Sequence, residues 1–307
     1  MIDKNKEVAG HLFAIFTILI WGTTFISTKV LLKSFEPIEI LFFRFSIGFV
    51  ALMIACPRRL KLTDKNQEWI FIGAGISGVT LYFLLENIAL TYSSASNVGV
   101  IMSIAPFFTA IFANWFLKGE RVKGNFLIGF IVAITGIFLI SFNGSIILKL
   151  NPIGDLLAIL AAVLWAVYSI LTRKISDYGY NTIQTTRHIF FYGLLFMLPI
   201  ILLFDFSLGI ERFREPVNLF NILFLGFGAS ALCFVTWNTA VKYLGAVKTS
   251  VYIYIVPVVV VVTSVLILKE KITWMSALGI ISTLSGLIIS ESKIIFLKRG
   301  IENEYTR

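Results

Sequence analysis

The sequence predicts an all-α membrane protein with ten transmembrane helices, arranged as two inverted five-helix repeats. Three observations lead to this prediction: a strongly apolar composition, a succession of long apolar segments, and motifs that occur twice in the same order. Of the 307 residues, 58% are apolar and 14% are charged, and the mean hydropathy is +0.90. Soluble domains are about a quarter charged, so this composition indicates a chain whose outer surface contacts lipid.

The apolar segments have the length of membrane-crossing helices, which need about 20 mainly apolar residues. The first is expected to remain in the protein, because it lacks the small-residue cleavage site of a signal peptide. The ten segments cover residues 10–31, 37–55, 69–91, 95–116, 124–142, 154–171, 182–203, 219–241, 246–268 and 274–290.

The 26 Lys and Arg residues indicate how the chain is oriented. Despite a net charge of +9, they fall in small groups between apolar segments, whereas nucleic-acid binding needs a basic face or stripe. With the N-terminus in the cytoplasm, 17 basic residues lie on the cytoplasmic side and 7 on the outer side. Basic residues are enriched in cytoplasmic loops. We therefore expect a multi-pass protein of the cell membrane, with both termini and the tail 293–307 cytoplasmic.

Three blocks of sequence occur twice in the same order. The segments 10–29 and 154–173 match at an offset of 144, which pairs Trp21 with Trp165. Further on, an offset of 151 pairs Pro106 with Pro257, and an offset of 150 pairs two glycines in each half. Shared hydrophobicity alone does not produce three ordered matches, so the sequence predicts an internal duplication.

The two halves, residues 1–143 and 152–292, each contain five predicted helices. Because five is odd, the second half enters the membrane from the opposite side. Inverted repeats of this kind are typical of secondary transporters, which bind substrate near the midplane between the repeats. The duplication therefore favours alternating access between two states of similar energy.

These repeated motifs resemble the EamA-like ten-helix branch of the drug/metabolite transporter superfamily over residues 10–290. The resemblance implies a carrier of small molecules with cytoplasmic termini, often an exporter of amino acids, related metabolites or drugs. Gly119 has no counterpart in the second copy, which affects a loop only. The matching residues are Ala89 to Ala95, Pro106, Leu117 to Arg121, Gly129 and Gly136 in the first half, and Ala240 to Ala246, Pro257, Leu268 to Lys271, Gly279 and Gly286 in the second.

Glu86 is the first candidate for a substrate-binding residue, because an ionisable group inside a membrane is costly and needs a reason. Tyr82 lies one helical turn before it and Asn87 beside it. Two interpretations stay open: a coupling proton site or counter-ion for a cationic or zwitterionic substrate, and a structural hydrogen bond or a wet position near the outer interface. Trp237 occupies the equivalent place in the second half, so the halves differ there.

Other ionisable residues in the apolar segments are expected to be structural. Arg44 is expected to find a partner on another helix or to extend toward the surface. Arg187 and His188 stand near the start of an apolar segment, and a lone histidine is weak evidence for a proton relay. Cys56 and Cys233 have no metal-ligand spacing and are expected to be small buried side chains.

Aromatic and amide residues complete the candidates for substrate contact. Aromatic rings can hold an ammonium group by cation–π attraction, and amides can bind substrate or join helices. With 29 Phe, 10 Tyr and 6 Trp in the chain, most rings must pack against neighbouring helices or lipid instead. The candidates are Trp21, Trp165, Tyr168, Trp237, Tyr254, Asn97 and Asn238.

Pro106 and Pro257 fall in the middle of predicted helices, where proline removes a backbone hydrogen bond and kinks the helix. They are predicted hinges for alternating access, with a fixed bend as the other interpretation. No nucleotide-binding or hydrolase motif is present, so we expect no catalytic residue, metal or cofactor.

The function favoured by the sequence is a secondary transporter of small organic metabolites, such as amino acids or related amines, working as an exporter with protons as a possible coupling ion. Two alternatives stay open: an efflux carrier for drugs or quaternary ammonium ions, and a lipid-handling membrane subunit. The sequence leaves open whether the chain is a monomer or a homodimer.

Overall fold

The computed structural model describes residues 4–93, 95–118, 124–142, 151–203, 206–268 and 273–291. These residues are helical apart from short turns and loops, which confirms the predicted all-α class. In the first half, the helices are α1 (Lys4–Leu31), α2 (Pro37–Ala55), α3 (Gln67–Gly75), the π-helical segment η1 (Ile76–Leu81), α4 (Tyr82–Tyr92), α5 (Ala95–Met102), α6 (Ala105–Phe116) and α7 (Gly124–Phe142).

The second half repeats much of this order. Its helices are α8 (Pro152–Asp177), α9 (Thr182–Ile201), the 3₁₀ turn η2 (Ile210–Arg214), α10 (Pro216–Leu223), the π-helical segment η3 (Phe224–Leu232), α11 (Cys233–Leu244), α12 (Ala246–Ser250), the 3₁₀ turn η4 (Val251–Tyr254), α13 (Ile255–Leu268) and α14 (Trp274–Glu291).

Within the described ranges, six helical segments are long and apolar enough to cross a membrane, and three shorter apolar helices accompany them. Their apolar side chains are also exposed on the outside, as expected of a surface solvated by lipid. Ile131 on α7 and Ile288 on α14, for example, are 64% and 65% exposed. The protein is therefore a multi-pass membrane protein. The six helices are Lys4–Leu31, Pro37–Ala55, Gln67–Tyr92, Asn97–Phe116, Pro152–Asp177 and Pro216–Leu244.

Polar side chains fix where several helices begin. The predicted break at Asn151 and Pro152 is the start of α8, where the Asn151 side chain accepts hydrogen bonds from the backbone N–H groups of residues 153 and 154 at 3.2 and 3.1 Å. Asn181 caps α9 in the same way. These caps satisfy N–H groups that lack partners inside the helix, so the short loops end where the sequence predicts.

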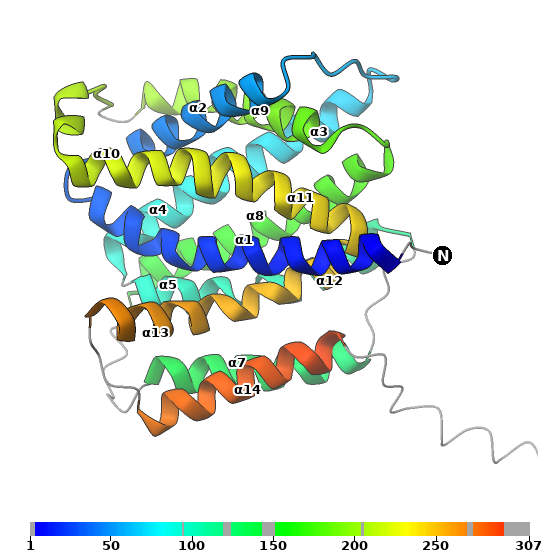
Figure 1. Ribbon diagram of the computed structural model, residues 1–307, viewed down its shortest axis with the longest axis vertical. Helices are drawn as coiled ribbons and strands as arrows, with labels where there is room; N and C mark the ends of the chain where they lie inside the picture. Colours follow the sequence, from blue (N-terminus) through cyan, green and yellow to red (C-terminus); the bar gives the residue numbers. More distant parts are fainter. Residues whose placement is uncertain are drawn as a thin grey trace, which may run out of the picture.

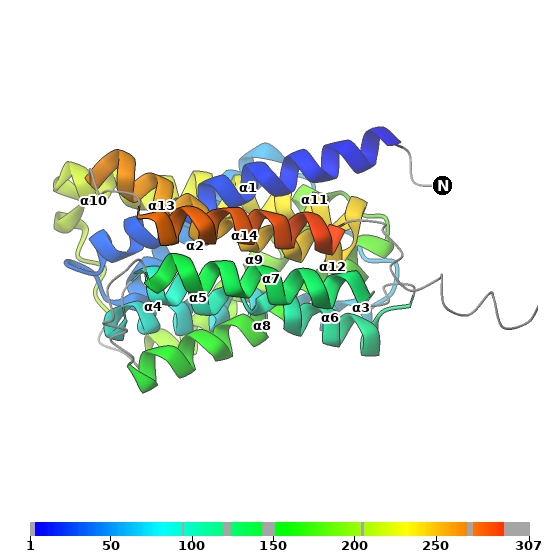
Figure 2. The same cartoon turned by 90° about the horizontal axis from the view of Figure 1, so that it is seen from below.

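The helices form a bundle whose outer edges are two helix pairs (Figure 1). α2 and α9 lie along one edge, and α7 and α14 lie along the opposite one (Figures 1 and 2). Between them, α1 packs against α11 and α13, while α8 packs against α4 and α6. Helices of the first half therefore pack mainly against helices of the second half, and the two halves share one interior.

Glycines bring α7 and α14 into close contact. A Cβ atom at Gly129 would lie 2.5 Å from the carbonyl oxygen of Gly286, and one at Gly136 would lie 2.6 Å from that of Gly279. Small residues allow this close approach of helix backbones in membranes. Because Gly129 faces Gly286 while Gly136 faces Gly279, the two helices run in opposite directions.

Helix breaks occur near both predicted hinge prolines. The hydrogen-bonded helix ends at Met102, and Pro106 lies in the first turn of α6. In the second half, the 3₁₀ turn η4 ends at Tyr254, and Pro257 follows close to the start of α13. Each proline thus stands near the beginning of a helix, where its missing N–H leaves no vacant hydrogen bond.

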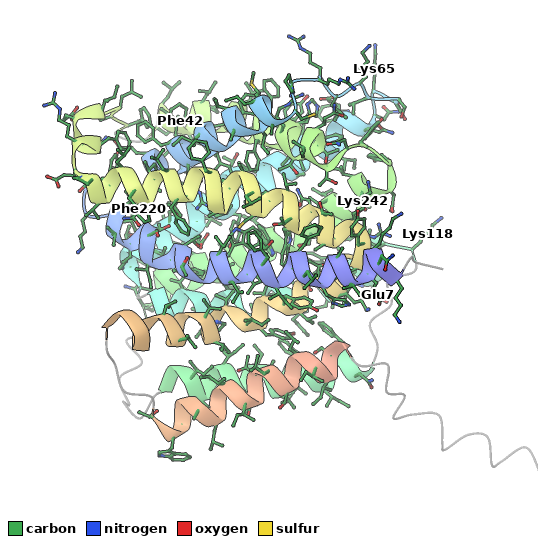
Figure 3. All side chains as sticks on the ribbon, in the orientation of Figure 1. Glu7, Phe42, Lys65, Lys118, Phe220 and Lys242 are labelled. Atoms are coloured by element: carbon green, nitrogen blue, oxygen red, sulfur yellow. The ribbon has the colours of Figure 1, made fainter. Side chains whose placement is uncertain are left out.

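The two ends of the bundle differ in charge. Lys65, Lys118 and Lys242 lie at the end that also holds the N-terminus of α1 (Figure 3). We call this the basic end. At the opposite end, Arg212 forms an ion pair with the buried Glu39 at 2.7 Å.

Candidate functional site

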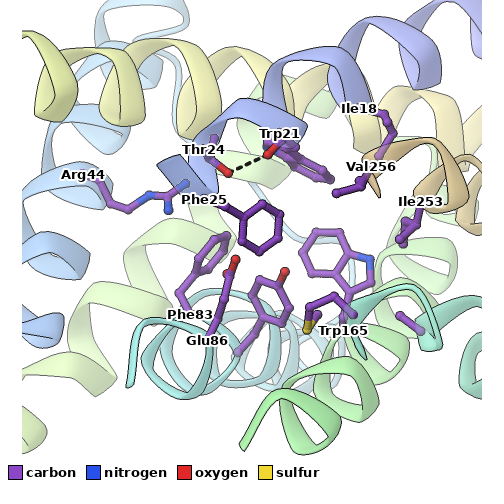
Figure 4. Close-up of a pocket in the computed structure, with 13 residues that line it drawn as sticks. Ile18, Trp21, Thr24, Phe25, Arg44, Phe83, Glu86, Trp165, Ile253 and Val256 are labelled. Carbon is purple, nitrogen blue, oxygen red and sulfur yellow. Dashed lines mark hydrogen bonds between the residues drawn. The ribbon is translucent and has the colours of Figure 1, made fainter. Parts of the chain in front are cut away.

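A cavity lies inside the bundle between helices of both halves (Figure 4). Its empty space, including the part open to solvent, is about 520 Å³. Its wall is mainly apolar and carries two charged side chains, Arg44 and Glu86, a composition typical of small-molecule sites. The lining residues are Ile18, Trp21, Thr24, Phe25, Arg44, Tyr82, Phe83, Glu86, Met102, Ala105, Trp165, Ile253 and Val256.

Glu86, on α4, lines this cavity and is 5% exposed. Its Oε2 atom is buried and has no hydrogen-bond partner among the described residues. Tyr82, one turn earlier on the same helix, also lines the cavity and interacts with the carboxylate. Because a buried polar atom without a partner costs free energy, this oxygen is available to a ligand.

Arg44, on α2, is the second charged residue of the cavity wall and is 2% exposed. Its Nε donates a hydrogen bond to Ser230 Oγ at 3.0 Å, and its guanidinium lies 4.3 Å from the centre of the Phe83 ring. Figure 4 shows Arg44, Phe83 and Glu86 on one side of the cavity. The cavity wall therefore carries one positive and one negative group that attract each other.

Arg44 was expected to be structural and was not among the candidates for substrate contact. The predicted partner on another helix is present, since Ser230 lies in η3. The same side chain also lines the cavity. The sequence did contain a signal for this second role. Arg44 and Glu86 have opposite charges in neighbouring apolar segments, and charges inside a membrane tend to pair.

Trp21 and Trp165 form the aromatic wall, with ring centres 5.2 Å apart and nearly perpendicular planes. The indole of Trp21 donates a hydrogen bond to the carbonyl oxygen of Ala229 at 2.9 Å, whereas the buried Nε1 of Trp165 has no partner among the described residues. Trp237 packs behind Trp21 at 5.1 Å between ring centres and does not line the cavity. The cavity therefore offers a π-face and one unused N–H donor.

Tyr168 and Asn238 lie near the aromatic wall but outside the residues that line the cavity. The Tyr168 hydroxyl donates a hydrogen bond to Asn238 Oδ1 at 2.9 Å, and Asn238 Nδ2 donates one to Thr186 Oγ1 at 3.0 Å. This chain of hydrogen bonds joins α8, α11 and α9. Both residues have protein partners for the groups predicted to contact substrate.

Three further candidates lie away from the cavity lining. Asn87 Nδ2 donates a hydrogen bond to the carbonyl oxygen of Pro37 at 3.2 Å, and Asn97 Nδ2 donates one to Asp155 Oδ1 at 2.6 Å. Tyr254 is fully buried in a cluster formed with α6 and α7, and its hydroxyl has no partner among the described residues. These amides join neighbouring helices, as the alternative interpretation expected.

Pro106 and Pro257, the two predicted hinges, are adjacent to the cavity. The residues just before them, Ala105 and Val256, both line it. One turn earlier, Met102 and Ile253 line it as well. Movement of either proline-containing segment would therefore change the shape of the cavity directly.

Arg187 and His188 lie at the basic end rather than in the cavity lining. The guanidinium of Arg187 donates hydrogen bonds to the carbonyl oxygens of Cys56 and Arg58 at 2.5 and 2.7 Å, and His188 Nε2 lies 2.7 Å from Glu68 Oε1. These contacts agree with the structural role expected of both residues.

Comparisons with known proteins point to one class of protein. The model of a family described as the EamA-like transporter family matches the chain twice, over residues 8–142 and 152–291. An uncharacterized transporter of Archaeoglobus fulgidus is 28% identical over 92% of this chain and 97% of its own length. A probable amino-acid metabolite efflux pump of Escherichia coli is 24% identical over 90% of this chain and 93% of its own length. One crystal structure matches with a TM-score of 0.75 at 20% identity, covering 93% of this chain and 98% of the other, which shows similarity of fold.

Proposed function

Because the chain belongs to the EamA-like transporter family, we propose that it is a secondary transporter that carries small zwitterionic metabolites, namely amino acids or related amines, across the cell membrane by alternating access. The observation that carries this proposal is the pair of opposite charges in one cavity, Glu86 with its unpartnered oxygen and Arg44 on the same side of the cavity.

An α-amino acid has an ammonium group and a carboxylate a few ångströms apart. Glu86 Oε2 is placed to accept hydrogen bonds from the ammonium group, and the guanidinium of Arg44 is placed to bind the carboxylate. Charge-assisted hydrogen bonds of this kind are roughly twice as strong as neutral ones. Trp21, Trp165 and Phe25 then surround an apolar side chain. Arg44 and Glu86 also attract each other within the cavity wall.

Alternating access between two five-helix halves, residues 1–143 and 152–292, is the mechanism we propose. The cavity lining supports it, because it includes three pairs of residues that the repeat makes equivalent. These pairs are Trp21 with Trp165, Met102 with Ile253, and Ala105 with Val256. An axis relating the halves would pass through the cavity, and Pro106 and Pro257 would act as matched hinges beside it.

The glycine contacts support the same relation. Gly129 corresponds to Gly279 in the repeat, and Gly136 corresponds to Gly286. The observed contacts are Gly129 with Gly286 and Gly136 with Gly279. A two-fold operation that exchanges the halves converts one contact into the other, and this supports the proposed inverted repeat.

We propose that the basic end faces the cytoplasm, since Lys65, Lys118 and Lys242 lie there (Figure 3) and basic residues are enriched on that side. Both termini, including the tail 293–307, would then be cytoplasmic. We propose that the protein exports its substrate, in line with the efflux activity in the name of the Escherichia coli relative.

We also propose that transport is coupled to protons, which would exchange with substrate at Glu86.

A quaternary ammonium ion is the second candidate substrate. The aromatic wall around Glu86 favours it, because aromatic faces attract such cations. Arg44 opposes it, since a fixed positive charge in the same cavity repels a ligand that has no carboxylate. The geometry therefore favours a zwitterion over a simple cation.

Counterflow in liposomes tests the proposal. Purified protein is reconstituted into vesicles loaded with an unlabelled neutral amino acid, and entry of the labelled compound is measured. We expect accumulation that requires the protein and is lost in Glu86→Gln. If the vesicles accumulate a quaternary ammonium ion but none of the amino acids tested, the zwitterion assignment is contradicted.

A further inference from the structure

A second hollow lies at the basic end, on the outer edge of the bundle formed by α2 and α9 (Figure 1). We call it the edge pocket. It encloses about 960 Å³ of empty space, including the part open to its surroundings, and shares no lining residue with the central cavity. Its lining residues are Phe49, Met53, Pro57, Arg59, Leu60, Arg187, His188 and Phe191.

The charge of the edge pocket is positive. Arg187 is 9% exposed, and no carboxylate of the described residues lies within 4.0 Å of its guanidinium, which is held by two carbonyl oxygens. Arg59 adds a second, exposed guanidinium. The acidic group beside the pocket is Glu68, whose Oε1 is already bonded to His188 and to the hydroxyl of Tyr192. Carbonyl oxygens orient a buried guanidinium but do not neutralise its charge. The positive charge of Arg187 therefore favours binding of an anion in the edge pocket.

The other wall of the edge pocket is apolar and open to the side. Met53 on α2 is 46% exposed and Phe191 on α9 is 45% exposed. Both helices lie at the outer edge of the bundle, where lipid surrounds the protein. The hollow therefore combines apolar side chains that are open to the side with two guanidinium groups at the basic end.

The geometry points to a site for an anionic phospholipid, with its phosphate between Arg59 and Arg187 and an acyl chain along Met53 and Phe191. Basic pockets between transmembrane helices at the cytoplasmic surface are suited to such headgroups. A free anion would gain nothing from the apolar wall, whereas a phospholipid uses both parts. α2 and α9 come from different halves of the chain, so a bound headgroup also joins the two halves at this end.

Native mass spectrometry of the purified full-length protein tests this site. Phosphatidylglycerol and phosphatidylcholine with the same acyl chains are titrated separately. We expect phosphatidylglycerol to bind more tightly to the wild type. Arg59→Gln should weaken its binding about tenfold, because it removes a charge-assisted hydrogen bond to the phosphate.

Arg58→Gln is the matched control, because it removes the same charge from the neighbouring residue, whose side chain does not line the pocket. It should leave phosphatidylglycerol binding unchanged. Thermal unfolding of both variants checks that they remain folded, as expected of substitutions at the exposed Arg58 and Arg59. Equal weakening by the two substitutions would overturn the proposal. So would equal binding of the two lipids, or displacement of phosphatidylglycerol by millimolar inorganic phosphate.

Discussion

Arg44 on α2 and Glu86 on α4 line the same cavity with opposite charges, although their helices are separate segments of the first half. Arg44 has a hydrogen-bond partner in Ser230 of the second half, whereas Glu86 Oε2 has none among the described residues. Arg44 is therefore held in place by the protein, whereas Glu86 keeps one oxygen free to bind a ligand. A site that binds and releases substrate needs both properties.

Replacing Glu86 should separate its role in transport from any role in stability. Glu86→Gln keeps the shape of the side chain but removes the charge that attracts the buried Arg44, so the melting temperature should fall modestly, because Ser230 still holds Arg44. Substrate affinity should fall about tenfold or more, since hydrogen bonds to charged groups contribute about 1.5–3 kcal/mol. Isothermal titration and thermal unfolding measure the two effects. The control is Glu7→Gln, which breaks a partly buried ion pair with Lys248 outside the cavity lining. A large loss of stability with normal affinity would instead indicate a structural carboxylate.

Arg44 should determine whether a carboxylate is required in the substrate. Arg44→Gln should reduce affinity for an amino acid about tenfold or more, while an amine without a carboxylate should lose little or gain. Ser230→Ala is the control, because it removes the 3.0 Å hydrogen bond from Arg44 and keeps the charge. If both substitutions reduce amino-acid and amine binding alike, Arg44 only supports the fold.

The contact between α7 and α14 should tolerate no side chain at Gly129. In Gly129→Ala, the new Cβ would lie 2.5 Å from the carbonyl oxygen of Gly286, and such overpacking costs about 1–3 kcal/mol. Gly99→Ala is the matched control, because its Cβ would meet nothing within 4 Å. Thermal unfolding in detergent should show a lower melting temperature for Gly129→Ala and an unchanged or higher one for Gly99→Ala. Equal melting temperatures would contradict the close helix contact.

Tyr168 should contribute to stability more than to substrate binding. Tyr168→Phe removes the hydroxyl that donates to Asn238 Oδ1 at 2.9 Å and leaves a buried acceptor without this partner, at a cost of about 1–3 kcal/mol. Substrate affinity should change little, because Tyr168 does not line the cavity. Thermal unfolding and titration with substrate measure the two effects. An unchanged melting temperature with a large loss of affinity would return Tyr168 to the substrate site.

The sequence allowed the helices and the repeat-related residues to be predicted, because both depend on local patterns. Apolar runs of sufficient length predict helices in a membrane, and the motif offsets predicted the correspondence of Trp21 with Trp165, both of which line the cavity. The proline positions predicted the helix breaks on the same grounds, since proline cannot continue the backbone hydrogen bonds of a helix.

The direction in which a side chain points could not be predicted, because it depends on which helices are neighbours. Asn97 lies beside Asp155 only after α5 and α8 pack together. Asn238 and Tyr168 likewise find each other across two helices. Arg44 was missed as a cavity residue for the same reason, since an apolar segment without a clear polar face does not reveal which side meets the interior.

The most direct test of the proposed zwitterion site compares three ligands that differ only in their charged groups. Binding to the purified protein is measured for a neutral amino acid, for the amine that lacks its carboxylate, and for the acid that lacks its amino group. We predict that the wild type binds the amino acid most tightly. Glu86→Gln should bind the amino acid and the acid without an amino group about equally. Arg44→Gln should bind the amino acid and the amine without a carboxylate about equally. Equal affinities of the wild type for all three ligands, or no binding of any amino acid, would contradict the assignment.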